Sequence, residues 1–226
     1  MPEKSKYKSV AFSLDVEEFP LLFLSATDPQ TYKAKSSYSA TAGLTPGSPQ
    51  LAALEAALIK TAKEAYGEGV DVKTLKFPLV SGTAKADKQK KKGEGNSYER
   101  TRGFVLFKAS SPTQYPPSLI FNSNGTMVAV NDGNRAVAKK HFYAGVFGHL
   151  EVALLAYDGN DNVDPADGPI IIPGVTAYLR TVISNSHGEN LGSGPDVNKW
   201  QNTAKRLGTV SDVDPTAAKA EGGLSY

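Results

Sequence analysis

The sequence predicts a mostly β protein, a barrel or sandwich of antiparallel strands with one main α-helix. Two observations predict this fold class. Several segments alternate apolar and polar residues with the period of a strand, and only the segment after Ser48 has the spacing of an amphipathic helix. A chain of 226 residues is long enough for one sizeable β-rich domain or two small ones.

Two strands are predicted before the helix. Val10 to Val16 alternates apolar and polar residues, and Phe19-Pro20 is expected to end this strand. A weaker alternation at Tyr32 to Tyr38 predicts a second strand. The polar stretch Thr41 to Pro49 is interpreted as a loop.

The helix that follows has clear start and stop signals. Ser48 is a suitable N-cap, Pro49 fits the first helical position, and Gly67 is well placed to end the helix. The apolar residues recur at a spacing of three or four, which favours packing against the sheet over a membrane surface, since the polar face is not notably basic. These residues are Leu51, Leu54, Leu58, Ala62 and Ala65.

The middle of the chain is predicted to contain a short strand, a loop and a long strand. Leu75 to Val80 is the short strand. The Gly- and Lys-rich segment Ser81 to Asn96 is interpreted as an exposed loop. Tyr98 to Lys108 is the long strand, with Phe107 on one side and the basic residues on the other.

A hairpin and two further strands complete the prediction. Asn124-Gly125 is a strong hairpin-turn signal between two short apolar runs. Phe142 to Tyr157 gives the clearest strand pattern, with Leu150 on its apolar face. The last strand, Gly174 to Ser184, is predicted to place the following residues on one side: Thr176, Tyr178, Arg180, Val182 and Ser184.

Several classes of chemistry are disfavoured. The chain has no cysteine, which excludes disulfides, thiol catalysis and cysteine-ligated zinc, and no stretch is apolar enough to span a membrane. The loop from Asp158 begins like a calcium site, but Val163 stands where glycine is required. His149 and Glu151 share a strand face without a third partner, so catalysis is not expected. We expect no metal and no cofactor.

Basic and aromatic residues recur together, as a single-stranded nucleic acid requires for its phosphates and unstacked bases. The net charge is only +2, so their distribution matters more than their number. The alternatives are that the aromatics fill the core, Phe147 more so than Tyr143 and Tyr178, and that the lysine run is a solvated loop. The predicted DNA-binding residues are Lys88, Lys90, Lys91, Lys92, Tyr98, Arg100, Arg102, Lys108, Tyr143, Phe147, Tyr178 and Arg180.

The order of segments resembles a family of tailed-phage single-stranded-DNA-binding proteins, formerly a domain of unknown function. The resemblance is strongest at His141 to Gly148, which is similar to that family's Phe-Tyr-x-Gly-x-Tyr/Phe-Gly strand. Four further segments support the resemblance: the helix Leu51 to Tyr66, the segment Leu75 to Leu79, the tripeptide Ala156 to Asp158 and the stretch Gly188 to Gly194.

The resemblance implies an elaborated OB-fold over residues 1–194. The composition after Ser184, rich in Gly, Asn, Ser and Pro, predicts a largely irregular tail, residues 195–226. The resemblance also implies a non-catalytic protein that coats single-stranded DNA during phage replication or recombination, in the cytoplasm of the infected bacterial host. Two features depart from the pattern. The main helix comes earlier than an OB-fold usually places it, and the tail carries only Asp212, Asp214 and Glu221 as acids, although it ends in Tyr226.

Other functions and partners stay open at this point. A structural β-sandwich protein of the phage virion would also be rich in strands, but would not need the pairing of arginine with aromatics. A nuclease would need a carboxylate cluster suited to Mg²⁺, for which the sequence gives no pattern. Two further partners beside single-stranded DNA stay open: duplex DNA, and replication proteins that the tail would contact. We do not expect the protein to bind a membrane.

Overall fold

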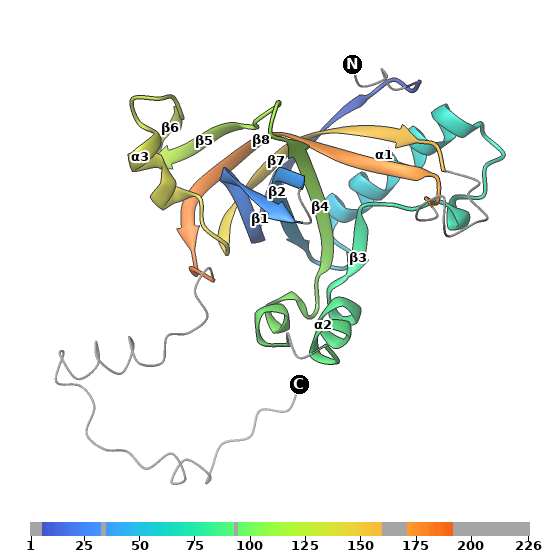
Figure 1. The fold of residues 1–226 in the computed structure, drawn as a ribbon, viewed down its shortest axis with the longest axis horizontal. Helices are drawn as coiled ribbons and strands as arrows, with labels where there is room; N and C mark the ends of the chain where they lie inside the picture. Colours follow the sequence, from blue (N-terminus) through green and yellow to red (C-terminus); the bar gives the residue numbers. More distant parts are fainter. Residues whose placement is uncertain (1–5, 33–34, 93–94, 160–170, 192–226) are drawn as a thin grey trace, which may run out of the picture. The chain divides into compact units, whose positions relative to one another are not determined.

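The computed structural model describes residues 6–32, 35–92, 95–159 and 171–191, and these contain a closed five-stranded β-barrel (Figure 1). Hydrogen-bonded neighbours follow the order β4-β2-β1-β7-β8, and β8 pairs back onto β4. This last pairing is parallel, and the others are antiparallel. This connectivity is that of a five-stranded OB-type Greek-key barrel, which confirms the predicted fold class. The barrel strands are β1 (Val10–Tyr32), β2 (Lys35–Leu44), β4 (Val105–Pro112), β7 (Val146–Tyr157) and β8 (Gly174–Gly188).

Inward-facing residues fill the barrel and alternate with outward-facing ones. On β7, Leu150, Val152 and Leu154 are buried, which confirms the predicted inner face of this strand. The small Ala42 of β2 lies beside the large Phe107 of β4, and both are fully buried. Burying a valine, leucine or phenylalanine side chain contributes about 1.5–3 kcal/mol, so a register slip that turned these residues outward would be costly.

β1 is longer and more bent than the alternation predicts. It continues through Phe19-Pro20, so the prediction that the strand ends there is wrong. Its pairing with β7 is irregular between Leu14 and Phe19, and this leaves Val16 77% exposed while Leu14 is buried. Such an irregularity bends a strand and increases its twist, which helps a long strand follow the wall of a small barrel.

β2 also differs from the prediction. The predicted strand Tyr32 to Tyr38 covers the end of β1 and the beginning of β2, and Thr41 to Leu44 belongs to β2 rather than to a loop. The inward positions of β2 are occupied by Ala40 and Ala42, whose small side chains give little hydrophobic pattern. The strand was therefore hard to recognise from its sequence.

The main helix, α1 (Pro49–Tyr66), begins and ends as predicted. The Ser48 side chain accepts a hydrogen bond from the backbone N–H of the third helical residue at 3.2 Å, and Gly67 ends the helix with a φ of 97°. The Tyr66 hydroxyl lies 2.5 Å from the carbonyl oxygen of Tyr157 and 2.9 Å from that of Gly174, which anchors the helix where β7 ends and β8 begins. The buried apolar face contains Leu51, Leu54, Leu58 and Ala62, as predicted.

The segment predicted as an exposed loop, Ser81 to Asn96, instead contains a helix. The Ser81 side chain caps this helix, and its first residue, Gly82, is buried so tightly that a Cβ there would lie 1.9 Å from the carbonyl oxygen of Thr101. The Thr101 hydroxyl, itself fully buried, lies 2.9 Å from the Gly82 carbonyl oxygen. The elements of this region are η1 (Val72–Thr74), β3 (Leu79–Ser81), α2 (Gly82–Lys90) and η2 (Gly95–Thr101).

The two strands predicted beside this helix are shorter than expected. Of Leu75 to Val80, only the last two residues belong to a strand, β3. Of Tyr98 to Lys108, the first part is η2, and the strand β4 begins at Val105. Figure 1 shows α2 and η2 as a small helical lobe at the end of β3 and β4.

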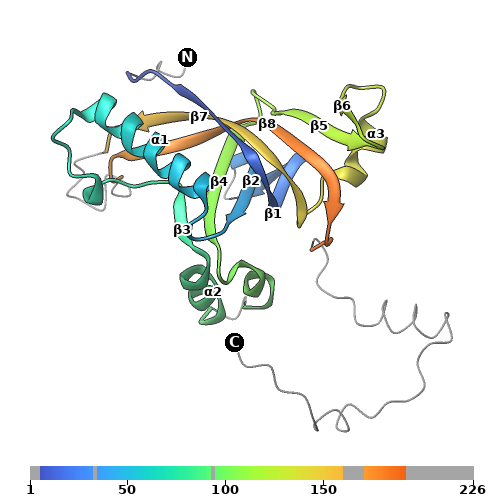
Figure 2. The ribbon, with the colours of Figure 1, turned by 180° about the vertical axis from the view of Figure 1, so that it is seen from behind.

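The predicted hairpin is confirmed. It consists of β5 (Ser118–Ser123) and β6 (Thr126–Ala129), and its turn places Asn124 and Gly125 at φ angles of 52° and 86°. β5 runs parallel to β8, and the hairpin is followed by α3 (Arg135–Ala138) and η3 (Lys139–His141). Figure 2 shows this hairpin and α1 near opposite ends of the β7–β8 ribbon.

Arg180 interrupts the alternation of β8. The strand pairing with β7 shifts register at this residue, so Val182 and Ser184 point into the barrel and are fully buried, while Tyr178 is 42% exposed. The prediction that Tyr178, Val182 and Ser184 share one side is therefore wrong. A bulge adds one residue to a strand and reverses the faces beyond it, and a simple alternation cannot reveal this.

Two predicted segments fall outside the described residues. They are most of the acidic loop that follows Asp158, and the tail, residues 195–226.

The barrel interior predicts a large difference between two valines. Val152→Ala should lower the free energy of unfolding by about 1–3 kcal/mol, because it removes two buried methyl groups and leaves a cavity. Val16→Ala, on the exposed irregular part of β1, should change it by less than about 0.5 kcal/mol. Urea unfolding followed by circular dichroism measures both. Equal losses would show that the register of β1 is wrong.

Candidate nucleic-acid interface

The outer surface of β1, β2 and β4 carries small hydroxyl side chains in register. Ser25, Ser39 and Ser110 form one row across the three strands. They point outward because their neighbours along the strands, such as Ala40 and Ala109, are fully buried in the barrel. Small outward side chains let an extended chain approach the sheet closely. We call the following residues, of which Thr41 is buried and the others are half-buried, the hydroxyl face: Ser25, Ser37, Ser39, Thr41 and Ser110.

A cluster of aromatic and basic side chains borders the hydroxyl face. Phe23, in the row formed with Thr41 and Lys108, has its ring centroid 5.3 Å from that of Tyr98. The Arg100 guanidinium carbon lies 4.3 Å from the Phe23 centroid, and the Lys85 ammonium 5.7 Å from the Tyr98 centroid. These distances are within the range of cation–π contacts. We call Phe23, Lys85, Tyr98 and Arg100 the basic–aromatic cluster.

Arg100 is held in place by burial and by one hydrogen bond. Its Nη1 donates to the carbonyl oxygen of Leu191 at 2.5 Å, while its buried Nε has no hydrogen-bond partner among the described residues. Burial lowers the pKa of the Arg100 guanidinium, which still stays charged at neutral pH because the ordinary value is so high. The cluster therefore presents a fixed positive charge over an aromatic ring.

Arg102, in contrast, has its charge balanced within the lobe. It forms ion pairs with Glu99 at 2.5 Å and with Asp87 at 2.8 Å. Two hydrogen bonds raise the pKa of Arg102, the one to Glu99 more than the one to Asp87. The hydrogen bond between Arg102 and Glu99 also lowers the pKa of Glu99. Arg102 thus ties η2 to α2 and positions its neighbour Arg100.

The lysine run lies on α2 and just after it. Lys88 follows Lys85 by one helical turn, so the two lysines lie on the same side of the helix. The side chains of the run are exposed: Lys88, Lys90, Lys91 and Lys92. The helix therefore extends the positive charge of the basic–aromatic cluster.

Lys108 and Tyr178 lie across the hydroxyl face from β1. Exposed Lys108 is the direct register partner of Thr41, and Tyr178 is the β8 partner of Ser110 in the pairing that closes the barrel. Positive and aromatic side chains therefore flank the hydroxyl face at both of its edges.

Tyr143 lies just before β7 and Phe147 near its start, and both are half-buried. The Tyr143 hydroxyl donates to the carbonyl oxygen of Gly188 at 3.1 Å, and burial raises its pKa. The Phe147 ring stacks on His187 with a centroid distance of 5.5 Å. The end of β8 thus contacts Tyr143 and Phe147, and Leu191, three residues after β8 ends, accepts the hydrogen bond of Arg100.

Arg180 is separate from the other predicted residues. At the bulge of β8 it lines a cleft of about 500 Å³, together with Glu151, Thr181 and residues of β1. Glu151 in this cleft accepts a hydrogen bond from the Thr181 hydroxyl at 2.6 Å.

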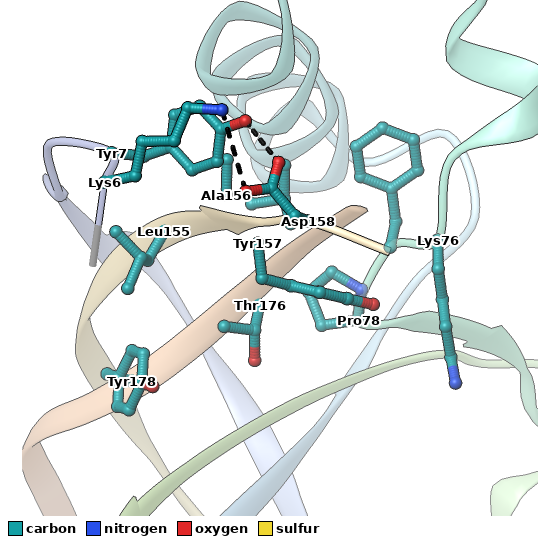
Figure 3. A pocket seen from close by; sticks show the side chains of 12 residues that line it. Lys6, Tyr7, Lys76, Pro78, Leu155, Ala156, Tyr157, Asp158, Thr176 and Tyr178 are labelled. Carbon is teal, nitrogen blue, oxygen red and sulfur yellow. Dashed lines mark hydrogen bonds and ion pairs between the residues drawn. The ribbon is translucent and has the colours of Figure 1, made fainter. Parts of the chain in front are cut away.

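A larger cleft, of about 880 Å³, adjoins Tyr178 (Figure 3). At one side Asp158 accepts a hydrogen bond from the Tyr7 hydroxyl at 2.5 Å and pairs with Lys6 at 3.7 Å. Figure 3 shows the Tyr157 side chain away from this ion pair, on the side of Lys76 and Thr176. The lining residues are Lys6, Tyr7, Lys76, Phe77, Pro78, Leu155, Ala156, Tyr157, Asp158, Val175, Thr176 and Tyr178.

Sequence reasoning missed several residues of these surfaces, including the whole hydroxyl face, whose small side chains carry neither a charge nor a ring. Phe23 lies in an apolar run that has no alternation to separate its inner and outer sides. Lys76 belongs to a segment that is mostly outside any strand, and it reaches the cleft only because it bridges to Gly174. Tyr157 is the last residue of its predicted strand, and the cleft beside it also involves Lys76 and Thr176, which are distant in sequence.

No protein-family model matches the sequence, and no curated protein matches it. Solved structures do. The single-stranded DNA-binding protein from bacteriophage Enc34 matches over 88% of this chain and 97% of its own, with a TM-score of 0.54 and 13% identity. The structure of the same protein in complex with single-stranded DNA matches over 84% of this chain and 97% of its own, with a TM-score of 0.52 and 13% identity. A weaker match is gp2.5, a single-stranded DNA-binding protein encoded by bacteriophage T7 (TM-score 0.49, 11% identity, 95% and 100% covered). The first two similarities support the same conclusion as the strand order, that the chain has an OB-type fold.

Proposed function

We propose that this protein binds single-stranded DNA without sequence preference and coats and protects it during phage replication or recombination. The hydroxyl face is the observation that carries the proposal. Most of it lies on the second and third barrel strands, the surface with which OB-folds bind oligonucleotides, and it is flanked by cations and aromatic rings. The similar Enc34 protein, whose structure was also solved with single-stranded DNA, supports the proposal.

The arrangement provides both interactions that a single strand requires. Lys85, Arg100 and Lys108 can neutralise phosphates, while Phe23, Tyr98 and Tyr178 can stack on bases. Neither contact reads base identity, because every nucleotide has a phosphate and a π face. We retain all twelve residues predicted from the sequence as candidates, with Arg102 acting through the position of η2 rather than as a free charge.

The proposed function assigns a role to each part of the chain. We propose that residues 1–194 form the binding domain, that residues 195–226 form a tail that can contact replication proteins, and that the protein acts in the cytoplasm of the infected bacterial host without catalysing a reaction. Within the described ranges, no helix is long and apolar enough to cross a membrane, and no three His, Cys, Asp or Glu side chains gather as a metal site would require.

A titration of fluorescent oligo-dT and of a matching duplex, each at two salt concentrations, tests the proposed function. Binding of the single strand should weaken with salt, with about −0.7 in the slope of log K against log salt for each neutralised phosphate. The duplex arm shows whether double-stranded DNA is also bound. Affinity that is indifferent to salt, or absent, would refute the proposal and favour a structural role in the virion. Cleavage of the oligonucleotide in Mg²⁺ would instead indicate a nuclease.

Tyr178 should contribute by stacking. Tyr178→Ala should weaken binding of oligo-dT by about 5- to 150-fold, the equivalent of about 1–3 kcal/mol for one stacked base, and leave the melting temperature nearly unchanged because the side chain is exposed. Tyr178→Phe keeps the ring and should bind like the wild type. If both variants bind normally, Tyr178 does not stack on DNA.

The lysine run at the end of α2 should contribute charge. Replacing Lys88, Lys90, Lys91 and Lys92 with alanine should weaken binding and make the salt dependence less steep, because each phosphate contact that is lost removes about 0.7 from the slope. Fluorescence titrations at several salt concentrations measure this.

A matched control separates local contacts from net charge. Replacing four lysines of α1 and η3 removes the same total charge from surfaces away from α2, and should leave the slope close to that of the wild type. An unchanged slope in the α2 variant would show that its lysines are only solvated. The control lysines are Lys60, Lys63, Lys139 and Lys140.

A further inference from the structure

The cleft of about 880 Å³ adjoins the edge of the hydroxyl face at Tyr178. Tyr178 connects the two surfaces: it is the register partner of Ser110 on β4, and it lines the cleft beside Thr176. A strand that crosses the hydroxyl face toward β8 therefore reaches the mouth of this cleft. The volume of the cleft is within the range of about 300–1,000 Å³ that is typical of small-molecule sites, which is enough for a nucleotide.

The lining of the cleft matches the chemistry of a nucleotide. Tyr157 and Tyr178 provide aromatic rings and Lys76 an exposed ammonium group. The carboxylate of Asp158, which would repel a phosphate, is already bound by Lys6 and by the Tyr7 hydroxyl. Figure 3 shows this ion pair on the other side of the cleft from Lys76. The side of Tyr157 and Lys76 thus offers a ring and a positive charge, and Asp158 is the one acidic residue among the described residues that line the cleft.

We propose that the cleft takes up the nucleotide at one end of the bound single strand, with its base against Tyr157 and its phosphate at Lys76. This subsite rests on the proposed function, since it extends the DNA path beyond Tyr178. The hydroxyl face and the basic–aromatic cluster hold the central nucleotides. The cleft adds affinity only for strands long enough to enter it.

A series of oligo-dT lengths, from about 4 to 16 nucleotides, tests this subsite, because OB-folds cover strands in this range. Lys76→Ala should leave the affinity for the shortest oligonucleotides unchanged. For the longest ones, it should weaken binding at low salt and reduce the salt slope by about 0.7. Lys73→Ala is the matched control, because it removes the same charge from an exposed position on η1 outside the cleft.

The role of the ring is tested in the same series. Tyr157→Leu keeps much of the apolar volume but removes the ring, so it should weaken binding of long oligonucleotides by about 5-fold or more and leave the short ones unchanged. Tyr157→Phe should bind every length like the wild type. Thermal unfolding of each variant shows whether a loss reflects damage to the fold, since Tyr157 is half-buried.

Photo-cross-linking gives a readout that does not depend on folding of a variant. An oligo-dT with 5-iododeoxyuridine at one terminus should cross-link to Tyr157 in the wild-type protein, and central substitutions should cross-link elsewhere. Two results together would overturn the subsite while leaving the proposed function intact. Neither terminus of the oligonucleotide would cross-link to Tyr157, and Lys76→Ala would bind oligonucleotides of every length like the wild type. Failure to bind at any length would overturn both the subsite and the proposed function.

Discussion

The structure depends on closure of the barrel by the parallel pairing of β4 with β8. This pairing brings Ser110 beside Tyr178 and gives every strand an inner and an outer side. The inner side is apolar, with Phe107 filling the space beside small alanines. The outer side of β2 and β4 is thereby free to carry serine, threonine and lysine. The alternation of inward and outward residues along β2 and β4 therefore produces both the apolar core and the candidate binding surface.

Local sequence signals predicted the elements whose stability is local. The α1 helix has its own cap, its own glycine stop and a continuous apolar stripe, and β7 has an unbroken alternation. The α2 helix has neither a stripe nor a strong pattern. It is held by contacts distant in sequence, such as the buried Gly82 against Thr101 and the ion pairs of Arg102. These contacts form only in the folded lobe, where η2 packs on α2, so the local sequence pattern does not predict the helix.

The candidate site was predicted in part for the same reason. Residue chemistry identified Tyr98, Arg100, Lys108 and Tyr178, which the fold places around the hydroxyl face. The bulge at Arg180 and the irregular pairing of β1 could not be read from alternation, because each changes which side a residue faces. A net charge of +2 is also no guide to this surface, since Arg102 is neutralised within its lobe while the neighbouring lysines stay exposed.

The central claim is that a single DNA strand lies on the outer face of β2 and β4. Backbone amide chemical shifts, recorded by NMR while oligo-dT is added to the protein, test it most directly. The account predicts the largest shift changes at Ser39, Thr41, Lys108 and Ser110, with little change in the β5–β6 hairpin. Changes confined to that hairpin, or to the Arg180 cleft, would contradict it.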